Sequence, residues 1–142
     1  MNKTKRIYKI KDYNSGDGML TAVWGPSIWH YLHTISFNYP IKPTPEQKHK
    51  YKELILNMQY TLPCKYCRIN LKNNFKVHPL TMKCMQSRAT FSRYIYKLHE
   101  IVNKMLKKKS DTLQNILKYL QNLSICLKRS IDMLAKHSQD EL

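Results

Sequence analysis

The stretch TPEQKHKYKELILNMQYTLPCKYC, residues 44–67, contains a helix with clear start and stop signals and a cysteine pair directly behind it. Thr44 suits the N-cap position, Pro45 the first helical turn, and Gln47 the position that closes a capping box. Pro63 should end the helix, because the residue before a proline is driven away from helical geometry. The residues that this helix should turn inward recur at helical spacing: Tyr51, Leu54, Ile55 and Met58.

The rest of the chain has the same helical character. Its three glycines all lie before residue 26, and a chain so poor in glycine is hard to build from strands and tight hairpins. Apolar residues recur at three- and four-residue spacing, which predicts an all-α fold. Further helices are expected at about 20–37, 64–74, 90–108 and 111–136, with a loop at 75–89. Their expected inward positions are Ile28, Leu32 and Ile35, then Phe91, Tyr94, Ile95, Leu98, Val102 and Leu106, and a near-heptad series from Leu113 to Leu134.

With 142 residues, the chain is long enough for one domain with a sizeable apolar core. We divide it into a polar, mobile lead-in at 1–18, a helical domain at 19–110 and a helical extension at 111–142. The near-heptad series of the extension has two interpretations. It belongs either to a helix packed on the domain, which we favour, or to a helix that pairs with another chain.

The formal net charge of +16 is large for this length. It is typical either of a protein with an acidic or phosphate-rich partner or of a lysine-rich solvated surface, and we favour the second because the basic residues are spread along the chain. No run of about 18 apolar residues predicts a membrane span. Residues 1–14 are basic but lack the apolar core of a secretion signal. We therefore expect a soluble protein in a reducing compartment, where a C-x-x-C pair is more often catalytic or metal-binding than structural.

Cys64 and Cys67 have two chemical interpretations. A cysteine at a helix start is biased toward the thiolate, which helps both disulfide exchange and metal binding. A zinc site could be assembled with His78 and Cys84, and together with the positive charge it would make a small nucleic-acid-binding module. Against this, zinc knuckles usually place their ligands on tight turns. A thioredoxin-like exchange protein is a third hypothesis, but no βαβ pattern surrounds the pair.

Three motifs together favour the redox interpretation. They are Trp24 to Ile35 (WGPSIWHYLHTI) followed by Tyr39-Pro40, then Pro63 to Cys67 (PCKYC), and then Leu98 to Leu106 (LHEIVNKML). In this order and separation they resemble the Erv/ALR family of FAD-linked sulfhydryl oxidases, over about residues 20–108. The Trp-Gly-Pro opening and the Leu-Pro-Cys lead-in are most similar to the branch found in large DNA viruses. The resemblance implies a four-helix bundle that encloses FAD, with an additional C-terminal helix.

The resemblance also implies a reaction. Protein dithiols would be oxidised to disulfides, with electrons passing through the Cys64–Cys67 pair to FAD and then to oxygen, which gives hydrogen peroxide. Cys64 would be the accessible cysteine that exchanges with substrate, and Cys67 the shielded one against the flavin ring. Lys65 and Arg68 add positive charge that favours the thiolate forms.

The residues implied as FAD contacts lie on two helical faces: Trp29 and His33 on one, His99, Val102 and Asn103 on the other, with Lys108 beyond them. Tyr119 could reach an adenine ring. Three positions depart from the family pattern: Glu100 replaces an asparagine, Leu62 a tyrosine, and Pro26 an arginine near the FAD.

The resemblance implies partners and a location too. A homodimer through the first two helices and a thioredoxin-like relay protein as substrate are expected, and nucleic acid is not. The expected location is host cytoplasm or virion. Cys84, in a loop beside basic residues, could shuttle electrons, whereas Cys126 is expected to be a buried, inert thiol.

Overall fold

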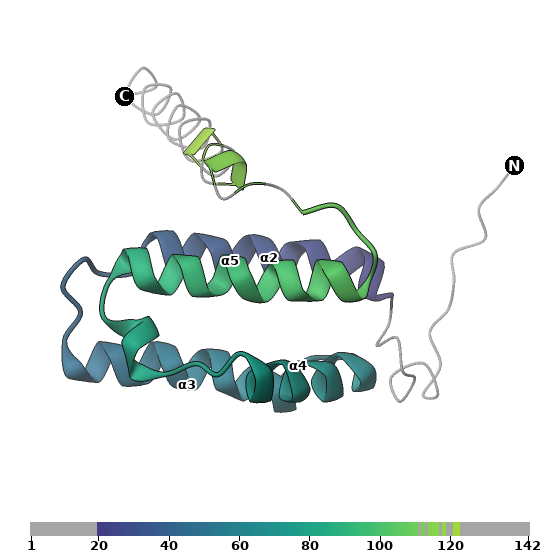
Figure 1. Ribbon diagram of the computed structural model, residues 1–142, viewed down its shortest axis with the longest axis horizontal. Helices are drawn as coiled ribbons and strands as arrows, with labels where there is room; N and C mark the ends of the chain where they lie inside the picture. The colour runs from purple at the N-terminus through teal and green to yellow at the C-terminus, as the bar shows by residue number, and fades with distance from the viewer. Residues whose placement is uncertain (1–19, 111, 113, 117, 119–120, 123–142) are drawn as a thin grey trace, which may run out of the picture.

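The computed structural model describes residues 20–110, 112, 114–116, 118, 121 and 122 (Figure 1). Its elements are α2 (Thr21–Phe37), α3 (Pro45–Thr61), α4 (Lys65–Val77), the short 3-10 helix η1 (Met82–Met85) and α5 (Arg88–Met105). These described residues include no strand, so the all-α prediction is confirmed. The predicted lead-in at 1–18 and most of the near-heptad series lie outside them.

The helices form two layers. Figure 1 shows α2 beside α5 in one layer and α3 beside α4 in the other, and η1 contacts both α3 and α5. No helix in the described part of the chain is long and apolar enough to cross a membrane.

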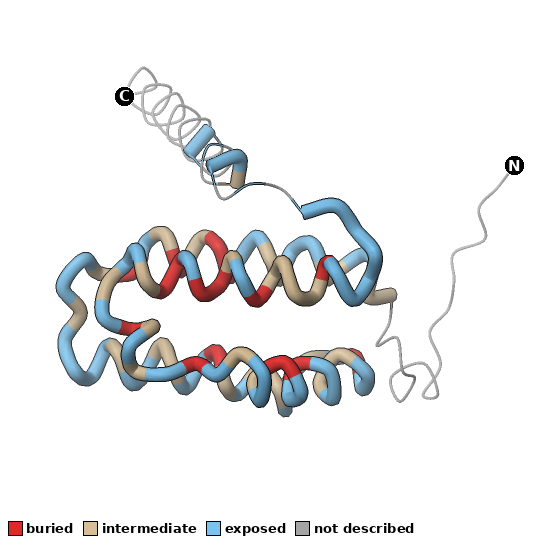
Figure 2. The backbone as a smooth tube through the Cα atoms, viewed as in Figure 1, coloured by how far each residue is buried: buried red, intermediate tan, exposed pale blue. Residues whose placement is uncertain are grey.

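The core lies between the two layers, and Figure 2 shows the buried residues on the sides of the helices that face each other. Tyr39 is completely buried in the connection after α2, and its hydroxyl donates a hydrogen bond to the Met85 carbonyl at 2.9 Å. The Arg88 guanidinium donates to the Tyr39 carbonyl at 2.6 Å. These bonds tie the α2–α3 connection to η1 and to the start of α5. The buried apolar cluster consists of Leu32, Tyr39, Ile55, Leu71, Leu80, Met85, Phe91, Tyr94, Ile95 and Leu98.

The start of α3 agrees with the prediction from its sequence. The Thr44 hydroxyl accepts the Gln47 N–H at 3.2 Å, and the Gln47 side chain accepts the Thr44 N–H at 2.9 Å. Pro45 occupies the first turn. Since two of the free N–H groups of the helix start are thereby satisfied, α3 begins at a defined residue.

Several predicted details are wrong. Leu54 is 41 % exposed and Leu106 is 55 % exposed, although both were expected to face inward. α3 contacts the core along a narrow seam on which only Ile55 is fully buried, and Leu106 lies just after the last residue of α5. The predicted loop at 75–89 instead contains the last turn of α4, the helix η1 and the first residues of α5.

α5 ends earlier than predicted because the chain turns at Lys107, whose φ is +53°. The Lys108 N–H donates to the Asn103 carbonyl at 2.8 Å, and the Lys107 N–H donates to the Lys104 carbonyl at 3.1 Å. This pair of bonds is the Schellman arrangement, in which a left-handed residue after the C-cap ends the helix.

Candidate active site

The cysteine pair is placed by the break between α3 and α4. α3 stops at Thr61, Leu62 and Pro63 continue in non-helical geometry, and Cys64 is the N-cap of α4. Cys64 and Cys67 form a disulfide with their Cα atoms 5.0 Å apart. The Sγ atom of Cys64 accepts the Cys67 N–H at 3.0 Å. The sequence-predicted pair is therefore a closed disulfide within the first turn of a helix.

The position of this disulfide favours its reduction to thiolates. Free N–H groups and the positive end of the macrodipole at a helix start stabilise negative charge on sulfur. Lys65 follows Cys64 directly and is exposed, while Arg68 is half-buried and donates a hydrogen bond to the Leu62 carbonyl. Sequence reasoning assigned Arg68 only a charge, but the structure also uses it to hold the turn that carries Cys64. A helical arginine four residues after an N-cap does not by itself reveal this contact.

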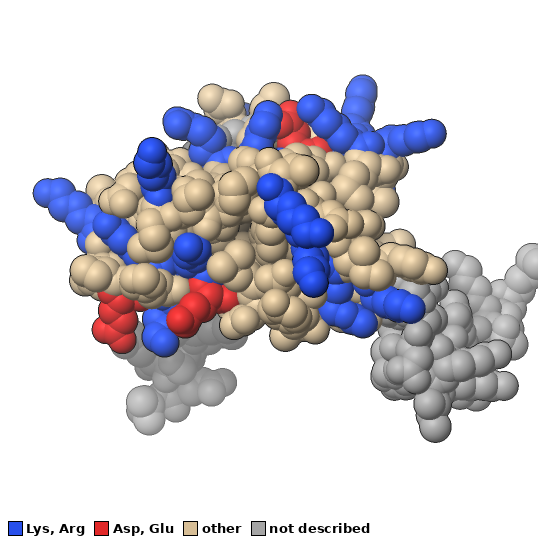
Figure 3. All heavy atoms as spheres, turned by 60° about the horizontal axis from the view of Figure 1, so that its bottom comes forward, with Lys and Arg blue, Asp and Glu red and all other residues tan. Residues whose placement is uncertain are grey.

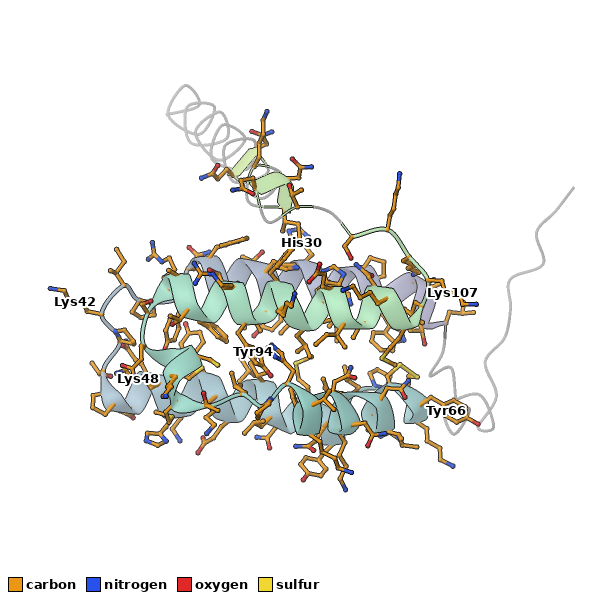
Figure 4. All side chains as sticks on the ribbon, in the orientation of Figure 1. His30, Lys42, Lys48, Tyr66, Tyr94 and Lys107 are labelled. Carbon is orange, nitrogen blue, oxygen red and sulfur yellow. A yellow bond between two sulfur atoms is a disulfide. The ribbon has the colours of Figure 1, made fainter. Side chains whose placement is uncertain are left out.

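The burial of Cys64 differs from the expectation. Cys64 was expected to be accessible and Cys67 shielded, whereas Cys64 is 4 % exposed and Cys67 is half-buried. Cys64 packs inward because its Sγ caps the helix, while Cys67 lies one turn further along. Figure 4 shows the yellow disulfide bond at the start of α4, on the side facing the α2–α5 layer.

A cluster of rings from α2 and α5 forms the second part of the site. The indole of Trp29 stacks on the imidazole of His99, with centroids 4.1 Å apart and planes inclined by 11°. His33 Nε2 and His99 Nδ1 are hydrogen-bonded at 2.9 Å. The stack leaves no room for a third ring between Trp29 and His99, so only the outer faces of these rings can receive a planar ligand.

His33 is the most perturbed titratable group of this cluster. Burial, together with the neighbouring imidazoles of His99 and His30, lowers the pKa of His33 from 6.5 to about 4. The ring is therefore neutral at pH 7. Its Nδ1 atom is buried and has no hydrogen-bond partner among the residues that the structure describes. A neutral imidazole with an unused buried nitrogen is suited to binding a polar atom of a ligand.

The remaining sequence-predicted contacts follow along α5. Asn103 is buried and its amide donates to the Ser110 hydroxyl at 3.4 Å, whereas Val102 is half-buried. The Lys108 side chain is exposed, in the turn beyond the helix. A cavity of about 10 Å³, room for one water molecule, lies beside His99 and Asn103. Of the predicted residues, α5 thus carries His99, Val102 and Asn103, and Lys108 follows it.

Glu100 stands where the resemblance implied a neutral amide, and the structure pairs its charge with a neighbouring lysine. Its carboxylate pairs with Lys97 at 2.9 Å, and the hydrogen bond from Lys97 lowers the pKa of Glu100. Pro26 lies within α2 and is exposed, and Leu62 is half-buried in the turn before Cys64.

The alternative zinc site is not supported. Within the described residues, no three His, Cys, Asp or Glu side chains are placed to hold one metal ion. Cys64 and Cys67 are bonded to each other, and His78 stacks on Tyr94 with ring centroids 4.6 Å apart. Cys84 lies on η1, not in the loop expected for it, with its thiol 3.5 Å from the Thr81 hydroxyl. Tyr119 and Cys126 lie outside the described residues.

The site thus combines two helix pairs of an all-helical fold: one carries a disulfide at the start of a helix, and the other carries a cluster of Trp and His rings. The sequence profile of the Erv1/Alr family matches residues 26–122. The chain belongs to the Erv1/Alr family.

Its relatives include proteins of viruses and of cellular organisms. A protein named probable FAD-linked sulfhydryl oxidase from Acanthamoeba polyphaga mimivirus is 35 % identical over 89 residues, which are 63 % of this chain and 62 % of that protein. The FAD-linked sulfhydryl oxidase ERV1 of Arabidopsis thaliana is 33 % identical over 99 residues, 70 % of this chain and 50 % of the relative. The chain thus spans less than two thirds of the length of these relatives.

Solved structures of the same fold include the FAD binding domain of Erv1 from Saccharomyces cerevisiae. It superposes with a TM-score of 0.66 at 25 % sequence identity, covering 73 % of this chain and 96 % of that domain. The yeast Erv1 core superposes with a TM-score of 0.61 at 22 % identity and covers 84 % of this chain. Both likenesses support the helical bundle found here.

Proposed function

We propose that the chain is an FAD-dependent thiol oxidase that forms disulfides in protein substrates and reduces oxygen to hydrogen peroxide. The observation that carries this proposal is the Cys64–Cys67 disulfide in the first turn of α4, on the side that faces the α2–α5 layer with its ring cluster. The names of the family relatives support the same activity.

The side chains present are chemically suited to a flavin. Trp29 and His99 offer ring faces, and the buried Nδ1 of His33 has no hydrogen-bond partner among the described residues. Asn103 places an amide on the same helix as His99. We propose that Trp29, His33, His99, Val102 and Asn103 hold FAD, with Lys108 contributing positive charge from the following turn.

The cysteines would perform the exchange chemistry. A substrate thiolate attacks one sulfur of the Cys64–Cys67 bond, and the other sulfur leaves as a thiolate that the helix start stabilises. The second substrate thiol then attacks the substrate sulfur of the mixed disulfide and displaces the enzyme cysteine as a thiolate, so that the substrate leaves as a disulfide and the Cys64–Cys67 pair retains two electrons and two protons. FAD, when bound, supplies the transfer of this electron pair to oxygen. The family pattern assigns the exchange to Cys64 and the flavin contact to Cys67, and the burial of Cys64 requires a substrate that engages the chain around it.

The oligomeric state proposed is a homodimer through the first two helices, α3 and above all α2. The helix α2 contains no Lys, Arg, Asp or Glu, although it belongs to a chain of net charge +16. Its surface nevertheless includes Val23, 68 % exposed, and Tyr31, 52 % exposed. A second copy of this uncharged face would cover these side chains.

The remaining parts of the proposal concern the setting of the reaction. The substrate would be a thioredoxin-like relay protein, and the location host cytoplasm or virion, as the resemblance to the viral branch implies. Residues 19–110 would carry the reaction, and residues 111–142 would form a helical extension of it.

The visible absorption spectrum and oxygen consumption of the purified protein test the proposal. We expect flavin bands at about 450 nm in the wild type and in Cys67→Ser, and oxygen consumption with dithiothreitol in the wild type alone. Cys84→Ser serves as the matched control and should retain both properties. A colourless protein, or one whose oxygen consumption survives Cys67→Ser, would contradict the proposal.

A further inference from the structure

One side of α4 carries charge of one sign. Lys65, Arg68, Lys72 and Lys76 follow one another at spacings of three, four and four residues, which places them on one side of the helix. We call this set the α4 basic stripe. It begins directly after Cys64 and extends over about 16 Å, eleven residues at 1.5 Å each.

In the described part of the chain, no acidic residue forms an ion pair with the α4 basic stripe. The sequence contains no Asp or Glu from residue 54 to residue 99. Glu53 pairs with Lys50, and Glu100 pairs with Lys97. Among the ion pairs of the described residues, none includes a member of the stripe. Figure 3 shows Lys and Arg side chains across this side of the molecule, with acidic side chains confined to small areas near its edges.

The beginning of the stripe is held in place beside the disulfide. The guanidinium of Arg68 donates to the Leu62 carbonyl, in the turn that presents Cys64. Tyr66, between the two cysteines, is 64 % exposed and points outward at this end of the molecule (Figure 4). A partner that rests on the stripe would therefore contact the segment that carries the reactive sulfurs.

We propose that the α4 basic stripe is the docking surface for the protein dithiol substrate, and that this substrate presents an acidic surface beside its cysteines. The inference rests on the proposed oxidase function and names the chemical class of its substrate. Because Cys64 is only 4 % exposed, a substrate held against α4 gains a high local concentration at a sulfur that free thiols reach poorly. A nucleic acid would fit the charge as well, but it has no thiol to exchange with the disulfide that adjoins the stripe.

The docked step exchanges thiols and changes no other bond. The two thiols of the acidic protein form a disulfide, the Cys64–Cys67 bond is broken, and two electrons and two protons pass to the cysteine pair. Charge complementarity acts on the association step, which it can accelerate by about 10- to 1,000-fold at low ionic strength. The effect is screened by salt, since the Debye length is only about 8 Å at 0.15 M.

The test uses three peptides that contain the same Cys-x-x-Cys pair, flanked by four glutamates, four glutamines or four lysines, with dithiothreitol as an uncharged reference. For the wild type we expect kcat/KM for the glutamate peptide to exceed that for the lysine peptide by about tenfold or more at 20 mM salt, and the difference to shrink at 0.5 M. Lys72→Glu/Lys76→Glu should remove the preference without changing dithiothreitol oxidation. The control variant Lys42→Glu/Lys83→Glu makes the same charge change at exposed positions and should keep the preference for the glutamate peptide. Lys42 lies at the opposite end of the molecule from Tyr66 (Figure 4).

A second readout separates this proposal from the oxidase function. Serine versions of the peptides, labelled with a fluorophore, report binding by anisotropy without any thiol chemistry. If the protein lacked flavin and oxidised no dithiol, the oxidase function would fail, while charge-selective binding to the stripe would still be measured. Equal rates and equal binding for all three peptides, or a preference lost equally in both double variants, would overturn the docking proposal. So would a 20-nucleotide DNA that binds through Lys72 and Lys76 while peptide charge has no effect.

Discussion

Two structural features of Cys64 have opposite effects on thiol–disulfide exchange. Its sulfur accepts the first N–H bond of α4, which stabilises a thiolate there, and the same inward position leaves it 4 % exposed. A small reductant gains little from the helix start if it cannot reach the sulfur. Cys64 therefore favours substrates that bind to the residues around it before they react.

His33 makes the stability of the fold depend on pH. Its pKa is lowered to about 4 in the folded protein and is about 6.5 in an unfolded chain, so the unfolded state binds more protons between these values. The stabilisation is therefore complete above pH 6.5 and is lost as the pH falls toward 4, by on the order of 2–3 kcal/mol.

The variant His33→Gln cannot take up this proton. The free energy of unfolding, measured by urea titration at pH 7, 6, 5 and 4, should fall less steeply in the variant than in the wild type. His78, whose pKa is also lowered, is common to both proteins and cancels in the difference, which therefore reports His33 together with its coupling to His30 and His99. Parallel pH profiles for the two proteins would show that His33 is readily protonated in the folded state.

At the scale of the elements, the C-terminus of α5 is built on an unfavourable residue. Lys107 adopts a φ of +53°, a left-handed conformation that glycine enters without steric cost. Lys107→Gly should raise the free energy of unfolding by about 0.5–1 kcal/mol, because the removed strain exceeds the extra chain entropy. Urea unfolding followed by circular dichroism measures this change.

Lys109→Gly is the matched control, since it removes the same charge from an exposed position that has no positive φ. It should leave the stability unchanged or lower it slightly. An equal gain in both variants would indicate that relief of charge repulsion, not of backbone strain, is the cause.

The elements show which structural features a sequence can predict. Thr44, Pro45 and Gln47 determine the start of α3 by local contacts, and that start was predicted correctly. Ser87 caps α5 through a capping box closed by Thr90 instead of the usual Glu or Gln, so the first turn of α5 was assigned to a loop. The left-handed turn at Lys107 has no sequence signal either, because glycine or asparagine would be expected there.

The family resemblance named candidate site residues but not their geometry. Trp29, His33 and His99 share a cluster, a contact between α2 and α5 that the spacing within either helix does not predict. The burial of Cys64 depends on how α4 packs against the other layer, and the anchoring of Arg68 on Leu62 joins a side chain to a backbone carbonyl across a turn. Both are tertiary contacts, which the spacing of residues along one helix does not report.

For the molecule as a whole, the distribution of charge divides the surface into two kinds. The helix α4 carries lysines and an arginine beside the disulfide, whereas α2 in the opposite layer carries no Lys, Arg, Asp or Glu. A positively charged protein gains solubility from the first surface and loses it at the second. The proposed contact with an acidic substrate lies on α4, whereas the uncharged face proposed for the contact with a second copy lies on α2, in the opposite layer.

The dimer proposed through α2 can be tested by placing a charge on that helix. Tyr31→Glu would bury a carboxylate in an apolar interface, which costs several kcal/mol and should weaken dimerisation by about 100-fold or more. Val77→Glu is the matched control, because it adds the same charge at an apolar, 78 % exposed position at the end of α4. Sedimentation equilibrium at about 10 µM should then find dimers for the wild type and Val77→Glu and monomers for Tyr31→Glu, with unchanged helical circular dichroism in all three. A monomeric wild type at this concentration, or a Tyr31→Glu variant that still dimerises, would rule out α2 as the interface and leave its uncharged face for another ligand.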